Sequence, residues 1–230
     1  MINFDVLRSI LEQTRRKKEE SLDISELVSR VRDICKGINH SEISLYIKER
    51  TKDGFCKYSI GTYLMGYQGY YYPSEFHLLR TDNMKRGRLV KRSDRSDYIY
   101  EYDRNGDIRH IVMPNCHATT YCLEEGNVQL RITYEDYNNQ RNPEILASTI
   151  ELKDPNGRTL CLIELLWAFK MEFADEVNIE IHDIEQSTCC SIHSGLDLKG
   201  GYEIYSIYKV LFQYDEKMKL VDYRRIYSRI

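Results

Sequence analysis

Residues 98–113 read YIYEYDRNGDIRHIVM, and this stretch decides the class of the fold. Tyrosine, isoleucine and valine dominate both of its halves, and these residues are typical of β-strands. Between the halves lies Asn105-Gly106, a pair that accepts the positive φ angles of a tight turn. The stretch therefore predicts a β-hairpin.

Two further stretches follow the same pattern of strand, turn and strand. One covers 145–152, turns at Asp154-Pro155-Asn156-Gly157 and continues from Arg158; the other covers 204–214 and 220–226. Single strands are predicted at 70–72, 76–80, 127–134 and 177–184. The apolar segment Leu160–Phe173 suits either a strand or a buried helix, and periodicity alone leaves both open.

Upstream of residue 69 the pattern is helical. Apolar residues recur at helical spacing in 6–11, 27–34 and 43–47, and a shorter fourth helix is predicted over 57–67. We therefore expect an α+β fold, in which a helical N-terminal region, 1–68, packs on a C-terminal antiparallel β-sheet of several hairpins, 69–230. The two regions can share one core.

Composition indicates an ordinary globular chain. It has 230 residues, 42% of them apolar, and a net charge of −3. No stretch reaches the roughly 18 apolar residues of a membrane span, and the N-terminus does not resemble a signal peptide. We therefore expect a cytoplasmic protein that does not contact the membrane. In that setting the seven cysteines are expected to be reduced thiols.

Motifs for chemistry are weak. The chain has no C-x-x-C pair, and the local Cys/His groups 116–122 and 189–193 each lack a second half, so no metal and no cofactor are predicted. Glu144 with Glu151-Leu152-Lys153 has the rough form of a metal-dependent nuclease site. Chance explains that form, because about two acid-x-Lys triplets are expected from the composition and three occur. A hydrolase is therefore the third interpretation, and no catalytic residue is predicted.

Charge is distributed unevenly along the chain. The segment 80–95 contains seven Lys and Arg against two Asp, whereas 172–185 contains six acids and no Lys or Arg. Uneven charge indicates what kind of partner binds. The predicted partner-binding residues are acidic and are expected to form one exposed patch, with Glu180 and His182 pointing outwards: Glu172, Asp175, Glu176, Glu180, Asp183 and Glu185. The predicted phosphate or nucleic-acid contacts are basic: Lys85, Arg86, Arg88, Lys91 and Arg92.

The segment 41–67 resembles a helix-turn-helix, with Gly54 in the turn. The resemblance fails where small or apolar residues are required, because Glu49, Arg50 and Asp53 occupy those positions. Because of these mismatches, a nucleic-acid-binding regulator that uses 41–67 and the basic segment 80–95 is kept only as the alternative function.

The hairpin Tyr100–Ile108 also resembles the Tyr-Asp…Gly hairpins of Rhs/YD-repeat proteins. Such hairpins occur in small proteins encoded beside bacterial polymorphic toxins as well. This resemblance implies a bacterial immunity-type protein, an antitoxin that binds a toxin and does no chemistry. Together with the acidic segment, it favours a non-enzymatic intracellular protein that occludes a basic toxin domain. The identity of the partner, the oligomeric state and any substrate stay open.

Overall fold

The computed structural model describes residues 2–17, 21–61, 87–91, 95–135, 143–168, 171–197, 201–214 and 220–228. The chain forms two compact units. The first unit comprises Met1–Lys36, Glu124–Gln129 and Thr149–Ile230, and the second comprises Gly37–Leu123 and Leu130–Ser148. Both units combine helices with antiparallel strands, so the chain has the predicted α+β class.

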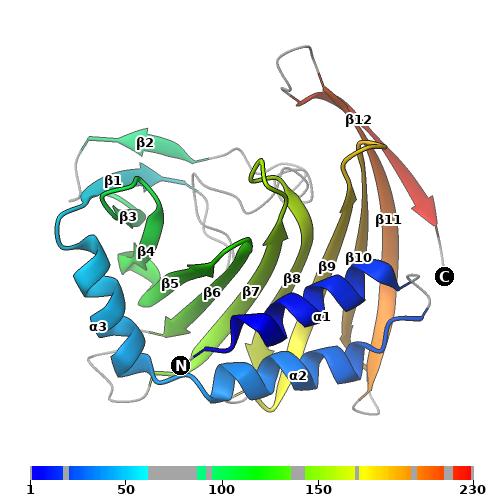
Figure 1. Cartoon of the computed structure of the whole chain (residues 1–230), viewed down its shortest axis with the longest axis horizontal. Coiled ribbons are helices and arrows are strands. Elements are labelled where there is room, and N and C mark those ends of the chain that lie inside the picture. The colour runs from blue at the N-terminus through cyan, green and yellow to red at the C-terminus, as the bar shows by residue number, and fades with distance from the viewer. Residues whose placement is uncertain are drawn as a thin grey trace. The chain divides into compact units, whose positions relative to one another are not determined.

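Two amphipathic helices belong to the first unit, α1 (Phe4–Arg16) and α2 (Ile24–Lys36). The side chain of Asn3 caps α1, because its Oδ1 accepts the backbone N–H of Val6 at 3.1 Å. Each helix buries one apolar stripe, which includes Leu7 and Leu11 in α1 and Val28 and Val31 in α2. α1 packs against β8 and α2 against β9, and both helices lie across the same side of the strands (Figure 1).

The strands of the first unit are long and antiparallel. Their order is β12-β11-β10-β9-β8-β7. Their bounds are β7 (Ile145–Lys153), β8 (Thr159–Ala168), β9 (Phe173–Asp183), β10 (Thr188–Leu196), β11 (Tyr202–Tyr214) and β12 (Leu220–Ser228). Ile179 in β9 pairs with Ile163 of β8 and Ile192 of β10, and all three side chains are fully buried. Leu160–Ala168 is therefore strand and not helix.

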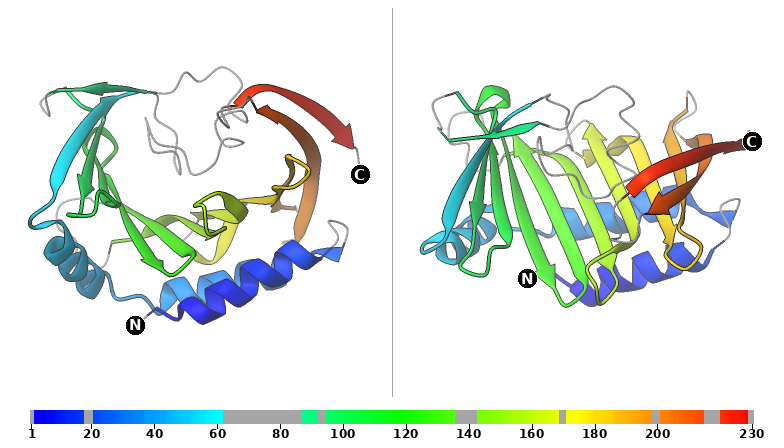
Figure 2. Two further views of the ribbon diagram at one scale, coloured as in Figure 1. Left: turned by 45° about the horizontal axis from the view of Figure 1, so that its top comes forward. Right: turned by 90° about the horizontal axis from the view of Figure 1, so that it is seen from above.

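The second unit contains α3 (His40–Thr51), which packs against β4. Its strand order is β6-β5-β4-β3-β1-β2. The bounds are β1 (Phe55–Ile60), β2 (Arg88–Val90), β3 (Tyr98–Tyr102), β4 (Ile108–Met113), a 3₁₀ turn η2 (Pro114–Cys116), β5 (Ala118–Glu125) and β6 (Val128–Glu135). β5, β6 and β7 each contribute residues to both units. Figure 2 shows the course of these strands from two further directions.

The hairpin that decides the fold is confirmed as β3 and β4. Gly106 has a φ of 87°, the left-handed conformation that the predicted turn requires. The three tyrosines of β3 are buried in a cluster with Ile111 and Met113 of β4. Tyrosine at alternate positions thus forms the core here, and it does not form an exposed recognition surface.

The fourth predicted helix is wrong where the structure describes it. Residues 57–60 belong to strand β1, which pairs with β3 through Tyr58 and Ile99. Pairing with β3 outweighs the weak helical pattern. The candidate strands 70–72 and 76–80 lie outside the described residues. β5 and β10 are strands that the sequence did not predict, and the sheet is accordingly larger than several hairpins.

The two predicted regions place the helices in 1–68 and the strands in 69–230. The compact units instead combine α1 and α2 with the strands after residue 149, and α3 with β1 to β4. Among the described helices, none is long and apolar enough to cross a membrane.

Candidate functional site

The six predicted partner-binding acids do not form one patch. Asp175 and Glu176 lie at the start of β9, with Glu172 just before it, and Asp183 lies at its end, with Glu185 in the following turn. These five side chains are exposed. Residues eight positions apart on an extended strand are about 26 Å apart. That distance exceeds the Debye length of about 10 Å in dilute salt, so the two ends act as separate charged groups.

Glu180 lies between these groups, and its predicted exposure is wrong. Its relative exposure is 0%, and its outward neighbour His182 is buried as well. β9 lies between β8 and β10, and side chains of the neighbouring strands pack beside these two residues. Leu162 of β8 and Ser191 of β10 flank Glu180 in register. The ring of Phe212 on β11 stacks on the ring of His182, with the two ring centroids 6.4 Å apart. The alternating pattern correctly assigns Glu180 and His182 to the face opposite Val177 and Ile179, but both faces of β9 are buried at this point.

The far end of β9 faces a pocket of mixed charge. Asp183 and Glu185 line a pocket of about 730 Å³ together with Arg15, Arg16 and Arg158. The Oδ1 of Asp183 accepts the backbone N–H of Glu185 at 3.1 Å, so this carboxylate stabilises the turn. Glu12 and Asp154 line the same pocket and pair with Arg16 and Arg158, so this end of β9 combines acids with arginines.

An exposed tyrosine of β11, Tyr205, lies in the region where β9, β10 and β11 bring two carboxylates close to each other. Gly195 of β10 pairs with Glu176 of β9 on one side and with Glu203 of β11 on the other. Both glutamates are exposed. Since adjacent strands are about 4.8 Å apart, the two glutamate backbones flank Gly195 at about 10 Å from each other.

A β-bulge places the tyrosine over that glycine. His193 pairs with Ser206 and Ser194 with Ile204, which leaves Tyr205 without a partner position on β10. A Cβ on Gly195 would lie 2.6 Å from Cε2 of Tyr205, so the ring rests directly on the glycine. The Tyr205 hydroxyl donates to the carbonyl of Leu196 at 3.1 Å. The ring is fixed in place and yet 61% of the residue is exposed.

We call Glu176, Glu203 and Tyr205 the acidic tyrosine surface. Just before β9, Arg32 of α2 donates to the backbone carbonyl of Glu172 at 2.9 Å. Tyr202 ties the start of β11 to β9, because its hydroxyl accepts the backbone N–H of Ala174 at 2.8 Å. Sequence analysis missed Glu203 and Tyr205. The bulge and the register that bring them beside Glu176 depend on strand pairing, and no local pattern indicates them.

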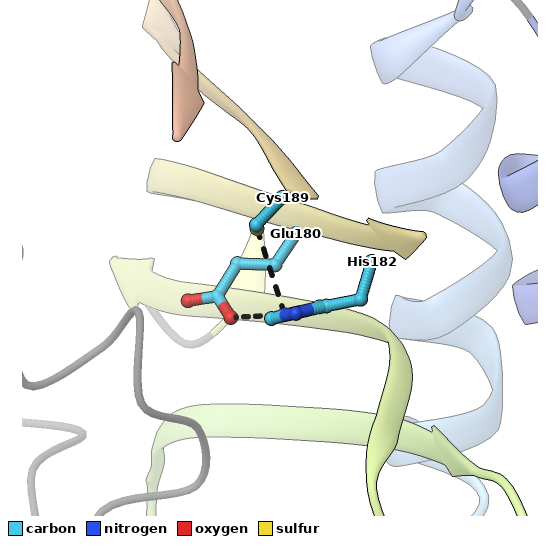
Figure 3. Close-up of side chains that lie close together, drawn as sticks. All are labelled: Glu180, His182 and Cys189. Atoms are coloured by element: carbon cyan, nitrogen blue, oxygen red, sulfur yellow. Dashed lines mark hydrogen bonds and ion pairs between the residues drawn. The ribbon is translucent and has the colours of Figure 1, made fainter. Parts of the chain in front are cut away.

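A second cluster is buried on β9 and β10. Glu180, His182 and Cys189 converge with their polar atoms facing one another (Figure 3). The Nε2 of His182 lies 3.1 Å from Oε2 of Glu180 and 3.6 Å from Sγ of Cys189. Strand register creates the cluster, because Cys189 pairs directly with His182.

Burial controls the chemistry of the thiols in this region. Burial, with Glu180 adding to it, raises the pKa of Cys189 well above its ordinary value. Burial likewise raises the pKa of Cys161 on β8 to about 12. Both groups are therefore neutral thiols near pH 7 in the protein without an ion, and neither is an activated nucleophile.

The metal-ligand groups considered in the sequence do not assemble. Cys122 is buried in the tyrosine cluster of the second unit, whereas His117 is exposed after η2. On β10, His193 contacts Ser191 at 3.2 Å and the ring of Tyr208, and Cys190 pairs with Ile181. Across the described ranges, Glu180, His182 and Cys189 are the one group with three ligand types within 4.8 Å.

Glu151 of the nuclease motif has partners within its own unit. Glu151 is buried, accepts a hydrogen bond from the hydroxyl of Thr159 at 2.6 Å and lies 3.7 Å from Nζ of Lys153. Glu144 is exposed and belongs to the other compact unit. Glu151 and Lys153 therefore have a structural explanation.

The basic segment is described in part. Arg88 on β2 and Lys91 just after it are exposed, while Lys85, Arg86 and Arg92 lie outside the described residues. The helix pair expected to accompany them is absent from 40–61, where α3 is followed by β1. The prediction of a DNA-recognition helix is therefore wrong for residues 57–60, which form a strand.

The chain matches none of the known protein families with which it was compared. It also matches no curated protein at a significant level of similarity.

Proposed function

We propose that the protein is a non-enzymatic intracellular binding protein of the immunity type, which occludes a basic toxin domain through the acidic tyrosine surface. The observation that carries this proposal is Tyr205. It is 61% exposed and is held over Gly195 by a bulge and a hydrogen bond, and the exposed Glu176 of β9 and Glu203 of β11 flank that glycine on its two sides.

Three properties of this surface suit a basic partner. A fixed tyrosine loses little conformational entropy on binding, which is why tyrosine is frequent among the residues that dominate interfaces. Its ring face attracts a lysine or arginine side chain through the cation–π interaction. The carboxylates of Glu176 and Glu203 are exposed beside it and accept charged hydrogen bonds.

The proposal differs from the sequence-based prediction in its residues. Glu180 does not contact a partner, since it is buried, and Asp183 and Glu185 belong to the mixed-charge pocket at the other end of β9. The β3–β4 hairpin supports the immunity class through its resemblance to the Tyr-Asp…Gly hairpins. The hairpin is itself part of a core, so the contact surface is assigned to the first unit.

Charge reversal tests the proposal. The variant Glu176→Lys with Glu203→Lys is compared with wild type in pull-downs from nuclease-treated lysate of the source organism, and the recovered protein is then titrated against both. We expect binding to weaken by about 2 kcal/mol or more, mainly through slower association that depends on salt. Cells producing the variant should also be protected less well against the recovered protein.

A matched control uses the same strand and the same charge change. In Asp183→Lys with Glu185→Lys the reversed charges lie at the other end of β9, and we expect binding close to that of wild type. Equal loss in both variants would show a general effect of net charge. Unaltered on-rate and salt dependence in the Glu176/Glu203 variant would contradict the proposal, and so would loss of every partner after nuclease treatment of wild type.

A further inference from the structure

The buried cluster of Glu180, His182 and Cys189 has the composition of a zinc site. Zinc is bound in proteins by a thiolate sulfur, an imidazole nitrogen and a carboxylate oxygen, which are the three atoms that meet here. Calcium and magnesium prefer sites made of oxygen alone. The mixture of sulfur, nitrogen and oxygen therefore favours zinc among the common divalent ions.

The distances agree with tetrahedral coordination. With usual zinc–ligand bond lengths, a tetrahedral site places sulfur about 3.6 Å from nitrogen, and nitrogen about 3.4 Å from oxygen. In the cluster, Sγ of Cys189 lies 3.6 Å from Nε2 of His182, and Nε2 lies 3.1 Å from Oε2 of Glu180. All three ligand atoms lie within 4.8 Å of one another, and the two distances to the imidazole are close to those of a tetrahedral site.

The arrangement around His182 also favours a cation over a relay of protons. Both Glu180 and Cys189 approach the same ring nitrogen, Nε2. In a catalytic triad the acid contacts one ring nitrogen and the nucleophile the other. Here an oxygen and a sulfur gather instead around a single ring nitrogen, as they do when all three atoms bind one cation.

The backbone holds these side chains rigidly. Glu180 and His182 are two positions apart on β9 and share one face, and β10 places Cys189 opposite His182. The ring of His182 stacks on Phe212, which fixes its orientation. All three residues are buried, and His182 also lines the pocket of about 730 Å³, through which a water molecule can reach the site.

We propose that Glu180, His182 and Cys189 bind a zinc ion, with a water molecule as the fourth ligand. The site is independent of the acidic tyrosine surface, and its binding of zinc does not require the proposed partner.

Zinc itself is the probe for this proposal. The full-length apo protein is titrated with Zn²⁺ in competition with a chromophoric chelator, and we expect one ion per chain. X-ray absorption of the zinc-loaded wild type should show one sulfur at about 2.3 Å together with nitrogen and oxygen ligands. Cobalt in place of zinc should show the charge-transfer absorption of a single thiolate.

Neighbouring residues supply matched variants. Cys189→Ser and His182→Gln should lower zinc affinity at least tenfold, whereas Cys190→Ser and His193→Gln on the same strand β10 should leave it unchanged. Absence of stoichiometric binding by wild type would overturn the proposal, as would absorption data without sulfur. Equal affinity in Cys189→Ser and Cys190→Ser would also overturn it. The measurements on wild type decide the question even where a variant fails to fold.

Discussion

Asp103 and Arg109 form a buried ion pair at the turn between β3 and β4. The Nε of Arg109 donates to Oδ2 of Asp103 at 2.7 Å, and Oδ1 accepts the backbone N–H groups of Asn105 and Asp107. We expect Asp103→Asn to destabilise the protein by about 2 kcal/mol, because it removes the closer of the two carboxylates that pair with the buried guanidinium and leaves Asp107 at 3.1 Å. Urea unfolding of wild type and variant measures this difference.

Asp154 provides the control, because its turn repeats the same hydrogen-bond pattern with Asn156 and Arg158. Its arginine is 42% exposed, against 8% for Arg109. The pair at Asp154 should therefore contribute only about 1 kcal/mol or less. Equal losses in Asp103→Asn and Asp154→Asn would contradict the role assigned to burial.

Asp103 also makes the stability of the protein depend on pH. Burial raises the pKa of Asp103, but the hydrogen bonds from Arg109 and the backbone outweigh it, and the net pKa is lowered. A lowered pKa contributes stability above the ordinary value of 3.8, and this contribution is lost as the pH falls through the lowered pKa. The unfolding midpoint of wild type should therefore fall more steeply than that of Asp103→Asn below about pH 4. Parallel curves would contradict this.

The cysteines should differ in reactivity. Burial raises the pKa of Cys161 to about 12, whereas Cys56 is exposed on β1 and has a pKa raised more modestly by partial burial and by Glu101. We expect iodoacetamide to modify Cys56 before Cys161 in the native protein, and faster as the pH rises towards 9, because the thiolate is the reactive form. Peptide mass spectrometry measures both sites, and early modification of Cys161 would contradict the described packing.

At the scale of the element, the bulge of β11 is tested through Gly195. In Gly195→Ala the new Cβ would lie 2.6 Å from Cε2 of Tyr205 and 2.9 Å from the carbonyl oxygen of Asp175. We expect a loss of stability of about 1–3 kcal/mol and a displaced Tyr205 ring. Binding of the proposed partner should weaken with it.

The variant Gly106→Ala distinguishes a general loss of stability from the displacement of the Tyr205 ring. Gly106 has a φ of 87° and no atom within 4 Å of an added Cβ, so its substitution costs about 1 kcal/mol through backbone strain alone. This variant should lose stability and keep partner affinity. Equal affinity of the two variants would show that the position of Tyr205 does not matter for binding.

At the scale of the whole molecule, the N-terminal helices complete the core of the first unit. Leu7 and Leu11 of α1 are fully buried, while Val6 on the same helix is exposed at 37%. We expect Leu7→Ala to cost about 2–5 kcal/mol and Val6→Ala under about 1 kcal/mol. Removal of residues 1–36 should leave a chain that aggregates or binds a hydrophobic dye. A soluble, cooperatively unfolding 37–230 fragment would contradict this.

Local physics explains the part of the fold that the sequence predicts. The turn residues Asn105-Gly106 and Asn156-Gly157, with β-branched and aromatic residues beside them, specify two hairpins without help from distant residues, and both are confirmed. The apolar stripes of α1 and α2 follow from the helical period in the same way. By contrast, β1 has a weak local pattern, and its pairing with β3 decides its structure.

The candidate sites depend on tertiary structure. The six acids of 172–185 are evident in the sequence, but their exposure depends on what packs on each part of β9, since Glu180 is buried and Glu176 on the same strand is exposed. Register places Cys189 against His182, and the bulge of β11 places Tyr205 over Gly195. The sequence alone determined the α+β class and the hairpins, because turns and periodicity act over a few residues. Tertiary structure alone decided which side chains meet, because strand pairing joins residues that no local preference brings together.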